Sequence, residues 1–565
     1  MMNKTSDRPF PALLLWFLLA WTCLNLIQAA VLNVDADEAY YWLYASSLRW
    51  GYFDHPPLVA LLIQLGESFG HGSFYTRLGT VLLSAGSVYF GYRMLPSQQR
   101  STTVYLLIFA SVVLFHVYGF IATPDSCLLF FTLLFFFRYK KYLHQQSLLN
   151  TLFLAFSITG MLYSKYHGVL PVLFVFLSNP KLVFKPTAWL VVALVTVAFL
   201  PHLYWQYLHD WPTFRYHLYE RVSGDYTIEK TTTYLLTQLF IWGLLTTVPV
   251  LYFWVKQKQK MDAYVRAHAF NFFGIFLFFF LSTFRFSVEG HWILAAGPSF
   301  IVVAHQVITT SSLNSQKRFR RLLRINIAFI LLLRGVLFLP ATALKPIEGL
   351  HAVLFGKQWA NDMFKQASGR PVVFANSYAW PALYKYYHPL EQTIGYNTAT
   401  YRKTQYSLDR ADTLLHNRDV LLASPDKLSN EDVMVESPFI TLYLHPQKRF
   451  QAVTPLLIEW DVPQKKVRAG QPADVGITLT NTGTDTVHTG NLLLGSVFVK
   501  AWEEKYASTA NLPFTDNLLP PGYTKKLRIT LQPPTKKGNY YLIFSVLQPP
   551  LAGSFASEFY KINVE

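Results

Sequence analysis

The chain has 565 residues, of which 52% are hydrophobic and only 14% are charged. Soluble domains carry about 25% charged residues, so the composition excludes an ordinary soluble protein and indicates a polytopic membrane protein. The formal net charge is +17, but many basic residues stand in short loops between apolar runs, which argues against nucleic-acid binding. The two cysteines, Cys23 and Cys127, lie in or beside apolar runs and indicate neither a disulfide framework nor a metal site.

The first part of the chain is a succession of apolar runs. We predict eleven spans, at residues 11–32, 75–95, 103–121, 123–138, 149–164, 167–179, 186–206, 233–255, 267–284, 290–308 and 322–341. The first run lacks a clear small-residue cleavage site, so we expect an uncleaved span rather than a signal peptide. The pair 149–164 and 167–179 fits two short helices or one broken helix. Arg334, inside the last span, either pairs within the bundle or marks a bend.

Lysine and arginine gather in alternate loops, and this bias predicts the orientation in the membrane. One side carries Lys4, Arg8, Arg93, Arg100, Arg138, Lys140, Lys141, Lys181, Lys185, Lys256, Lys258, Lys260, Arg266, Lys317, Arg318, Arg320, Arg321 and Arg324. This alternation fits eleven spans with the N-terminus in the cytoplasm, so the chain after residue 341 is expected outside. The first loop, Asp125, Lys165 and the loops 207–232 and 285–291 share that outer side.

After residue 341 no long apolar run follows. Residues 342–451 include short apolar runs such as "VVFA" and "VLLAS" between possible helices, which predicts a small extramembrane α/β region. Residues 452–565 read as alternating strands, for example "ADVGITLTNTG" and "KKLRITLQ", separated by turns such as "TKKGN". That pattern predicts an all-β, immunoglobulin-like sandwich. The expected domains are therefore a transmembrane domain 1–341, the α/β region and the sandwich.

Ionisable groups that face a cavity at a membrane surface are functional candidates. The outer segments offer Asp35, Asp37, Glu38, Asp54, Asp125, Glu220, Glu289, Arg49, His55, Lys165, Arg215, His217, Arg221, Arg285 and His291. Arginine and lysine can bind the phosphate of a lipid-linked substrate, and aromatic side chains at this depth can lie against a sugar ring. Cleavage of a sugar–phosphate bond needs one carboxylate as base, whereas glycosidases need a carboxyl pair.

Six short motifs follow one another in a family-like order: "DADEAYYW", "GYFDHPPL", "ATPDS", "SKYHG", "FRYHLYERV" and "EGHWILAAGP". Over residues 10–425 the chain resembles the class C (GT-C) glycosyltransferases. It is most similar to the bacterial branch of the protein O-mannosyltransferase and lipid A aminoarabinose transferase superfamily. The resemblance implies a GT-C membrane domain of about eleven helices.

The resemblance also implies roles for individual acids. The family's catalytic acid matches Asp37, followed here by Glu38, so Asp37 is expected to act as general base on the acceptor hydroxyl. A second family acid matches Asp125. The family often has lysine before the Pro-Pro of the first loop, where it serves the lipid phosphate. This chain has His55 there, a weaker partner for phosphate unless its pKa is raised.

Other cations are expected to replace that lysine. Lys165 and Arg221 are the expected phosphate ligands, with His217 as a further candidate. Tyr40, Tyr41, Tyr166 and His291 complete the expected substrate-binding set. No cofactor is expected. A divalent cation is compatible with the oxygens of Asp37, Glu38 and Asp125, but nothing in their spacing requires one.

We therefore expect a glycosyltransferase of a bacterial inner membrane. It transfers a single hexosyl or pentosyl group from a polyprenyl-phosphate-linked donor to a hydroxyl of a lipid, glycan or protein acceptor on the extracytoplasmic face. Its partners are these substrates and the bilayer, without nucleic acid. A eukaryotic secretory membrane would satisfy the same topology.

Two other functions fit parts of the sequence. A transporter or flippase of lipid-linked sugars also needs cations and aromatics, although it more often has broken helices near the bilayer midplane. A binding or assembly protein would use the β domain as its working part.

Each candidate residue also has a structural interpretation. Asp35 or Asp37 can cap a helix, and Asp125 can be an acid of a first helical turn. Lys165 and Arg221 can snorkel to the interface. His55 and His291 can be loop histidines with satisfied hydrogen bonds.

Overall fold

The computed structural model describes residues 11–97, 100–220, 226–256, 261–501 and 504–565. The chain divides into two compact units. The first comprises Met1–Asn33, Tyr44–Leu208 and Tyr226–Leu344. The second comprises Val34–Leu43, His209–Asp225 and Lys345–Glu565.

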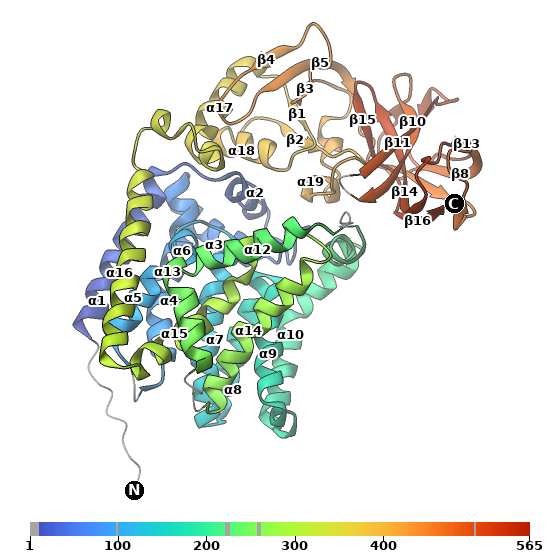
Figure 1. Ribbon diagram of the computed structural model, residues 1–565. Coiled ribbons are helices and arrows are strands. Elements are labelled where there is room, and N and C mark those ends of the chain that lie inside the picture. Colours follow the sequence, from blue (N-terminus) through green and yellow to red (C-terminus); the bar gives the residue numbers. More distant parts are fainter. Residues whose placement is uncertain (1–10, 98–99, 221–225, 257–260, 502–503) are drawn as a thin grey trace. The chain divides into compact units, whose positions relative to one another are not determined.

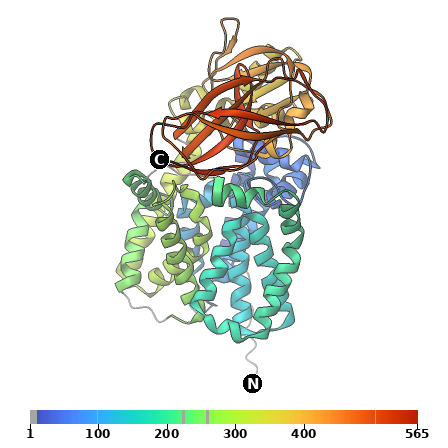
Figure 2. The ribbon, with the colours of Figure 1, turned by 90° about the vertical axis from the view of Figure 1, so that its right-hand side faces the viewer.

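The first unit is helical, and its long helices run side by side in both views (Figures 1 and 2). Helix α7 packs against both α4 and α8, and α14 packs against α9 and α15. The elements are α1 (Ala12–Val31), α3 (Leu58–Glu67), α4 (Ser73–Met94), α5 (Thr102–Ser111), α6 (Val113–Val117), α7 (Pro124–His144), α8 (Leu148–Ser164), η2 (Tyr166–Gly168), α9 (Val169–Ser178), η3 (Pro180–Phe184), α10 (Pro186–Leu208), α12 (Ile228–Ile241), α13 (Leu244–Lys256), α14 (Ala263–Ser282), η5 (Gly290–Ala296), α15 (Gly297–Thr310), α16 (Leu313–Val336) and η6 (Ala341–Leu344).

Several of these helices have the length and apolar composition of membrane spans. Among the described residues, four pass both tests: α1, α10, α14 and the segment Gly290–Thr310. Helices α12 and α13 meet at a bend of 95° and add a fifth if they form one broken span. Each of the eleven predicted spans lies on a helix or on a pair of consecutive helices, while the number of crossings stays a prediction. The chain is thus a multi-pass helical membrane protein.

The predicted pair 149–164 and 167–179 forms two helices, α8 and α9. They are separated at Lys165, whose backbone is extended (φ −161°, ψ 145°). The break ends the i→i−4 hydrogen bonding of α8 and places Lys165 where its side chain can leave the helix axis. A functional candidate therefore lies at a chain break rather than within a regular helix.

Arg334 pairs within the bundle, which decides between the two alternatives. Its guanidinium donates to Gln28 Oε1, to Asn25 Oδ1 at 2.8 Å and to His116 Nδ1 at 3.1 Å. The ring of Trp21 lies 5.9 Å from it. These neutral acceptors satisfy a buried cation and join α16 to α1 and α6.

The second unit begins with an α/β region. Its five-stranded sheet has the order β2-β1-β3-β5-β4, in which β1, β2 and β3 are parallel to one another and β4 and β5 are antiparallel additions. In the register Val372 lies opposite both Thr393 and Leu421. The elements are η7 (Glu348–Leu350), α17 (His351–Ala367), β1 (Val372–Ala375), α18 (Ala379–Tyr387), β2 (Thr393–Tyr396), α19 (Gln405–Leu408), η8 (Ala411–Leu415), β3 (Arg418–Ser424), β4 (Val433–Val435) and β5 (Leu442–Phe450).

Helix α2 (Ala36–Ala45) starts in the second unit, which also holds α11 (Pro212–Arg215) and the π-helical turn η4 (Tyr216–Glu220). These segments come from the two outer loops that the sequence marked as functional. Because these segments belong to the second unit, some of the predicted site residues are in the same compact unit as the α/β region.

The C-terminal strands form a sandwich of two mainly antiparallel sheets, as predicted. One has the order β11-β10-β14-β16-β7 with β15 beside β14, and the other has the order β13-β8-β6. Trp460 of β6 packs edge-on against Phe544 of β14 at 5.9 Å, so the two sheets share a core. The strands are β6 (Leu456–Trp460), β7 (Lys466–Val467), β8 (Ala473–Asn481), β9 (Val487–His488), β10 (Leu493–Ala501), β11 (Glu504–Pro513), β12 (Leu518–Leu519), β13 (Thr524–Leu531), β14 (Gly538–Gln548), β15 (Leu551–Phe555) and β16 (Tyr560–Val564).

The core of the sandwich continues into the α/β region. Val373 and Val420 of the parallel sheet belong to the same buried cluster as Ile477 and Phe544 of the sandwich. The domain bounds at residues 341 and 451 therefore stay a prediction, although the predicted class of each part is confirmed.

Candidate functional site

Helix α2 begins with a hydrogen-bonded cap formed by two acids. The Asp35 carboxylate accepts from the backbone N–H of Asp37 at 3.0 Å, and the Glu38 carboxylate accepts from the N–H of Asp35 at 2.9 Å. This reciprocal pattern is close to a capping box, which satisfies backbone donors at a helix start. Asp35 is therefore the cap, and Glu38 supports it.

The carboxylate of Asp37 has a different partner. Tyr378 Oη, in the loop between β1 and α18, donates to Asp37 Oδ1 at 2.8 Å. Asp37 is half-buried, in contrast to Glu38, which is fully buried. The structure thus separates the three neighbouring acids of this segment, because two of them build the helix start and the third faces a tyrosine.

The tyrosines of α2 pack on the α/β region. Tyr40 Oη accepts from the backbone N–H of Gln405 at 2.8 Å, and its ring lies 4.8 Å from that of Tyr378. Tyr41 is buried beside Tyr40, with ring centroids 6.3 Å apart. Both residues were predicted to bind substrate. In the structure the Tyr40 hydroxyl holds α2 against the start of α19.

A cation lies next to the same cluster. The Arg402 guanidinium lies over the ring of Tyr378 at 4.7 Å and near the ring of Tyr216 at 5.5 Å. Neither Tyr378 nor Arg402 was expected from the sequence, because no motif marks "SYAW" or "TYRK" as functional. A tyrosine and an arginine placed after successive strands of a parallel sheet were the available signal.

In the first unit, Asp125 and Lys165 form a buried ion pair. Lys165 Nζ donates to Asp125 Oδ1 at 2.9 Å and to Oδ2 at 2.8 Å. The two residues are 5% and 6% exposed. Asp125 stands in the first turn of α7, directly after Pro124 at the helix start, and Lys165 stands at the break between α8 and α9. Two helix ends therefore bring opposite charges together.

Two histidines join this pair. His291 Nε2, from the start of η5, lies 3.8 Å from Asp125 Oδ2. His55, from the first loop, interacts electrostatically with the same carboxylate. Three of the predicted site residues, Lys165, His55 and His291, therefore surround the buried carboxylate of Asp125, the fourth.

The remaining predicted residues lie elsewhere or are not described. Tyr166 Oη bonds His202 Nε2 at 2.8 Å and accepts from Gln206 Nε2 at 2.9 Å, so it faces α10. His217 is exposed in η4, beside the ring of Tyr216. Arg221 lies outside the described residues.

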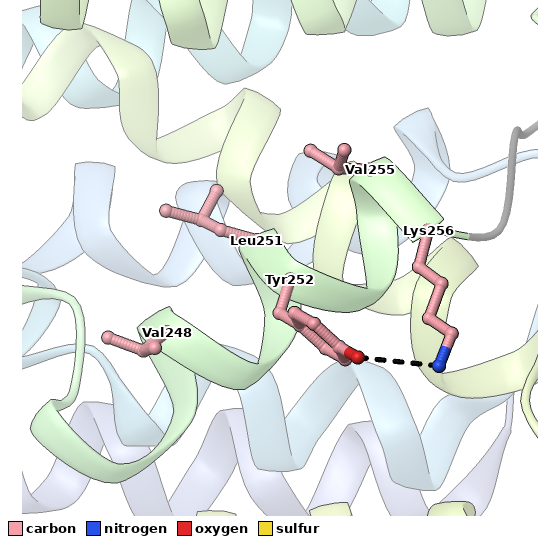
Figure 3. A pocket seen from close by; sticks show the side chains of 5 residues that line it. All are labelled: Val248, Leu251, Tyr252, Val255 and Lys256. Atoms are coloured by element: carbon pink, nitrogen blue, oxygen red, sulfur yellow. Dashed lines mark hydrogen bonds between the residues drawn. The ribbon is translucent and has the colours of Figure 1, made fainter.

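Within residues 11–97, 100–220, 226–256, 261–501 and 504–565, no three His, Cys, Asp or Glu side chains are grouped to hold a metal ion. A mainly apolar hollow on α13, in which Lys256 donates to Tyr252 Oη at 3.3 Å, holds none of the predicted site residues (Figure 3).

Comparison with known proteins agrees with the resemblance seen in the sequence. Residues 54–205 match the family model for dolichyl-phosphate-mannose-protein mannosyltransferase. This stretch contains His55, Asp125 and Lys165. No curated protein sequence matches the chain.

Two solved structures share the fold. ArnT from Cupriavidus metallidurans in the apo state aligns with a TM-score of 0.57 at 12% sequence identity, over 76% of this chain and 97% of that chain. The same protein bound to undecaprenyl phosphate aligns with a TM-score of 0.54 at 14% identity, over the same shares. The family match and the shared fold confirm the resemblance to the superfamily of O-mannosyltransferases and lipid A aminoarabinose transferases.

Proposed function

Since the chain has the GT-C fold and matches the mannosyltransferase family model, we propose that it is a membrane glycosyltransferase. It moves one sugar from a polyprenyl-phosphate donor to a hydroxyl of a lipid, glycan or protein. The observation that carries the proposal is the ion pair of Asp125 and Lys165, buried within the family-matched stretch and flanked by His55 and His291. Charged groups of this kind are retained in membrane proteins chiefly for function.

Lys165 and the two histidines are the proposed ligands of the donor phosphate. An ammonium has three N–H donors, and Asp125 accepts two of those of Lys165. We assign the third donor to a phosphate oxygen. Asp125 holds the ammonium in place, so that it stabilises the charge that grows on the leaving phosphate. Undecaprenyl phosphate is the lipid bound in the structure of ArnT from Cupriavidus metallidurans, which shares the fold.

Asp37 is the proposed general base. It removes the proton from the acceptor hydroxyl as that oxygen attacks the anomeric carbon. The bond between this carbon and the phosphate oxygen breaks, and polyprenyl phosphate leaves with the electron pair. No second carboxyl is needed to protonate the leaving group, because a phosphate is already a weak base.

The proposed location follows the expected topology. The reaction takes place at the extracytoplasmic face of a bacterial inner membrane, with the N-terminus in the cytoplasm. We assign catalysis to the membrane domain 1–341. The β-sandwich 452–565 is proposed to recognise the acceptor or to position the enzyme.

The proposal is tested with purified protein in nanodiscs. A panel of radiolabelled polyprenyl-phosphate sugars is supplied together with a membrane extract as the source of acceptor, and release of free polyprenyl phosphate is followed. Release that depends on the extract establishes a transferase and identifies the sugar. Binding of a donor without release of polyprenyl phosphate, together with movement of intact donor across proteoliposomes, would show a transporter instead.

A further inference from the structure

The carboxyl edge of the parallel sheet in the second unit is occupied by helix α2. Strand β1 ends at Ala375 and is followed by Tyr378, and β2 ends at Tyr396 and is followed by the segment 402–405. Ligands of α/β sheets bind outside this edge, where loops present side chains without disturbing the sheet. Here both loops reach α2, through Tyr378 to Asp37 and through the Gln405 amide to Tyr40.

From this juxtaposition we propose that Tyr378 is a positioning residue for the catalytic base, and that the α/β region is part of the active site. The inference rests on the proposed function, because it concerns the residue proposed as base. The Tyr378 hydroxyl fixes the Asp37 carboxylate through Oδ1, and the carboxylate takes the proton of the acceptor. A carboxylate fixed in this way loses less freedom when the acceptor is bound.

The loop that carries Tyr378 is itself held in place. Ser377 Oγ accepts from the backbone N–H of Ala379 at 3.2 Å and of Trp380 at 3.0 Å, which closes the turn into α18. Asn376, at a φ of 53°, accepts through Oδ1 from the N–H and the hydroxyl of Thr398 at 2.9 and 2.8 Å. The ends of β1 and β2 are thereby joined just before the loop reaches Asp37.

Arg402 supports the same role. Its guanidinium lies over the π face of the Tyr378 ring, an arrangement that is favourable by itself. A cation in this position withdraws electron density from the ring and makes the phenol a stronger hydrogen-bond donor. The cluster therefore supplies Asp37 with a donor that is both fixed and polarised.

Helix α18 offers a matched control. The hydroxyl of Tyr384 is buried and makes no hydrogen bond in the part of the chain that the structure describes. The variants Tyr378→Phe and Tyr384→Phe each remove one hydroxyl from the same short segment. Only the first removes a bond to Asp37.

The test measures turnover of a polyprenyl-phosphate sugar by the full-length protein in nanodiscs. For Tyr378→Phe we expect kcat to fall about tenfold or more, as for loss of a hydrogen bond to a charged group, with the donor KM unchanged. The acid limb of the pH–rate profile moves to higher pH, because the lost bond favoured the charged carboxylate. Among the described residues, the charged and titratable groups next to Asp37 or to its partner Tyr378 include Asp35, Glu38, Tyr40 and Arg402.

If Tyr378 had a purely structural role, Tyr378→Phe would lower the thermal stability without moving the pH–rate profile. Tyr384→Phe is expected to match the wild type in rate and profile. If Asp37→Asn is inactive but Tyr378→Phe matches the wild type, the positioning role is wrong and the proposed function stands. If Asp37→Asn remains fully active, the proposed base itself is wrong.

A second measurement does not depend on turnover. Hydrogen exchange of the backbone amides of residues 36–43 reports how firmly α2 is held. We expect faster exchange in Tyr378→Phe than in Tyr384→Phe. Equal exchange in the two variants would show that Tyr378 does not hold the helix, and would overturn the inference even if no donor had yet been found.

Discussion

The pair of Asp125 and Lys165 is both a structural feature and a candidate binding group. Removing two charges from water costs several kcal/mol for each ion, and only a well-formed pair offsets that cost. The two bonds at 2.8 and 2.9 Å meet this condition. Removing one partner leaves the other charge buried, so single variants test stability and function together.

For Lys165→Gln we therefore expect a loss of about 3–5 kcal/mol of stability, together with loss of donor binding. The double variant Asp125→Asn, Lys165→Gln removes both charges, and we expect it to recover much of the stability but not the binding. Thermal unfolding in nanodiscs measures the first quantity, and titration with polyprenyl phosphate measures the second. Wild-type affinity in the double variant would contradict the phosphate role.

At the scale of the element, Arg77 of α4 closes the end of helix α1. Its guanidinium donates to the carbonyl oxygens of Leu32 and Asn33, both at 2.8 Å, and of Ala29 at 3.4 Å. The last carbonyl oxygens of a helix lie beyond its i→i−4 hydrogen bonds, and a cation is also favourable at this end of the dipole. The chain reaches α2 three residues later, so Arg77 fixes where the segment containing Asp37 departs from α1.

Arg77→Met is expected to lower stability by at least about 2 kcal/mol, since buried carbonyls lose a charged donor. Lysine keeps the charge but lacks the planar guanidinium that donates to three oxygens at once. The stability of Arg77→Lys is therefore expected to lie between those of the wild type and Arg77→Met. Thermal unfolding of the three proteins in the same detergent checks the order. Equal stability of the wild type and Arg77→Met would contradict the role in capping α1.

In the α/β region, the turn before β4 contains an acid with a perturbed pKa. Burial acts to raise the pKa of Asp432, but hydrogen bonds from the Ser429 hydroxyl and amide, from His445 and from the Leu428 amide hold it well below its ordinary range. A lowered folded-state pKa stabilises the fold above the ordinary carboxyl pKa. This contribution is lost as pH falls through the folded-state value.

We expect the wild type to lose more stability than Asp432→Asn when the pH is lowered from 7 toward ~3, a range that includes the ordinary carboxyl pKa. Hydrogen exchange of residues 425–445 in the full chain, measured at several pH values, isolates this contribution. The same acid dependence in both proteins would show that Asp432 does not stabilise the turn.

At the scale of the whole molecule, the sequence predicts the helices and strands better than it predicts which residues contact one another. Every predicted span lies on a helix or on a pair of consecutive helices, because a long apolar run has few alternatives in a bilayer. The β-sandwich followed from strand alternation and turn residues, both of which are local signals. The number of crossings was less predictable, since helices such as α5, with 10 residues, are too short to be counted by length.

The candidate site could be predicted only for residues that lie on the outer side of the predicted topology and also belong to one of the family-like motifs. His55, Asp125, Lys165 and His291 were all expected, and the structure brings them together. The partner of Asp37 was not expected, because Tyr378 lies 341 residues further along the chain. A contact between residues so far apart in the sequence depends on which loops the strand order of the sheet places side by side. No rule of residue spacing within a single sequence predicts such a contact.

The role of Asp37 as the base is the central claim, and one comparison of variants tests it directly. Asp37→Asn removes the base and keeps the size of the side chain, while Asp35→Asn is the matched control because asparagine caps helices as well as aspartate. We expect Asp37→Asn to slow sugar transfer by about 10²–10⁴ while donor binding is retained, and Asp35→Asn to stay near the wild-type rate. Transfer by Asp37→Asn at the wild-type rate would contradict the central claim.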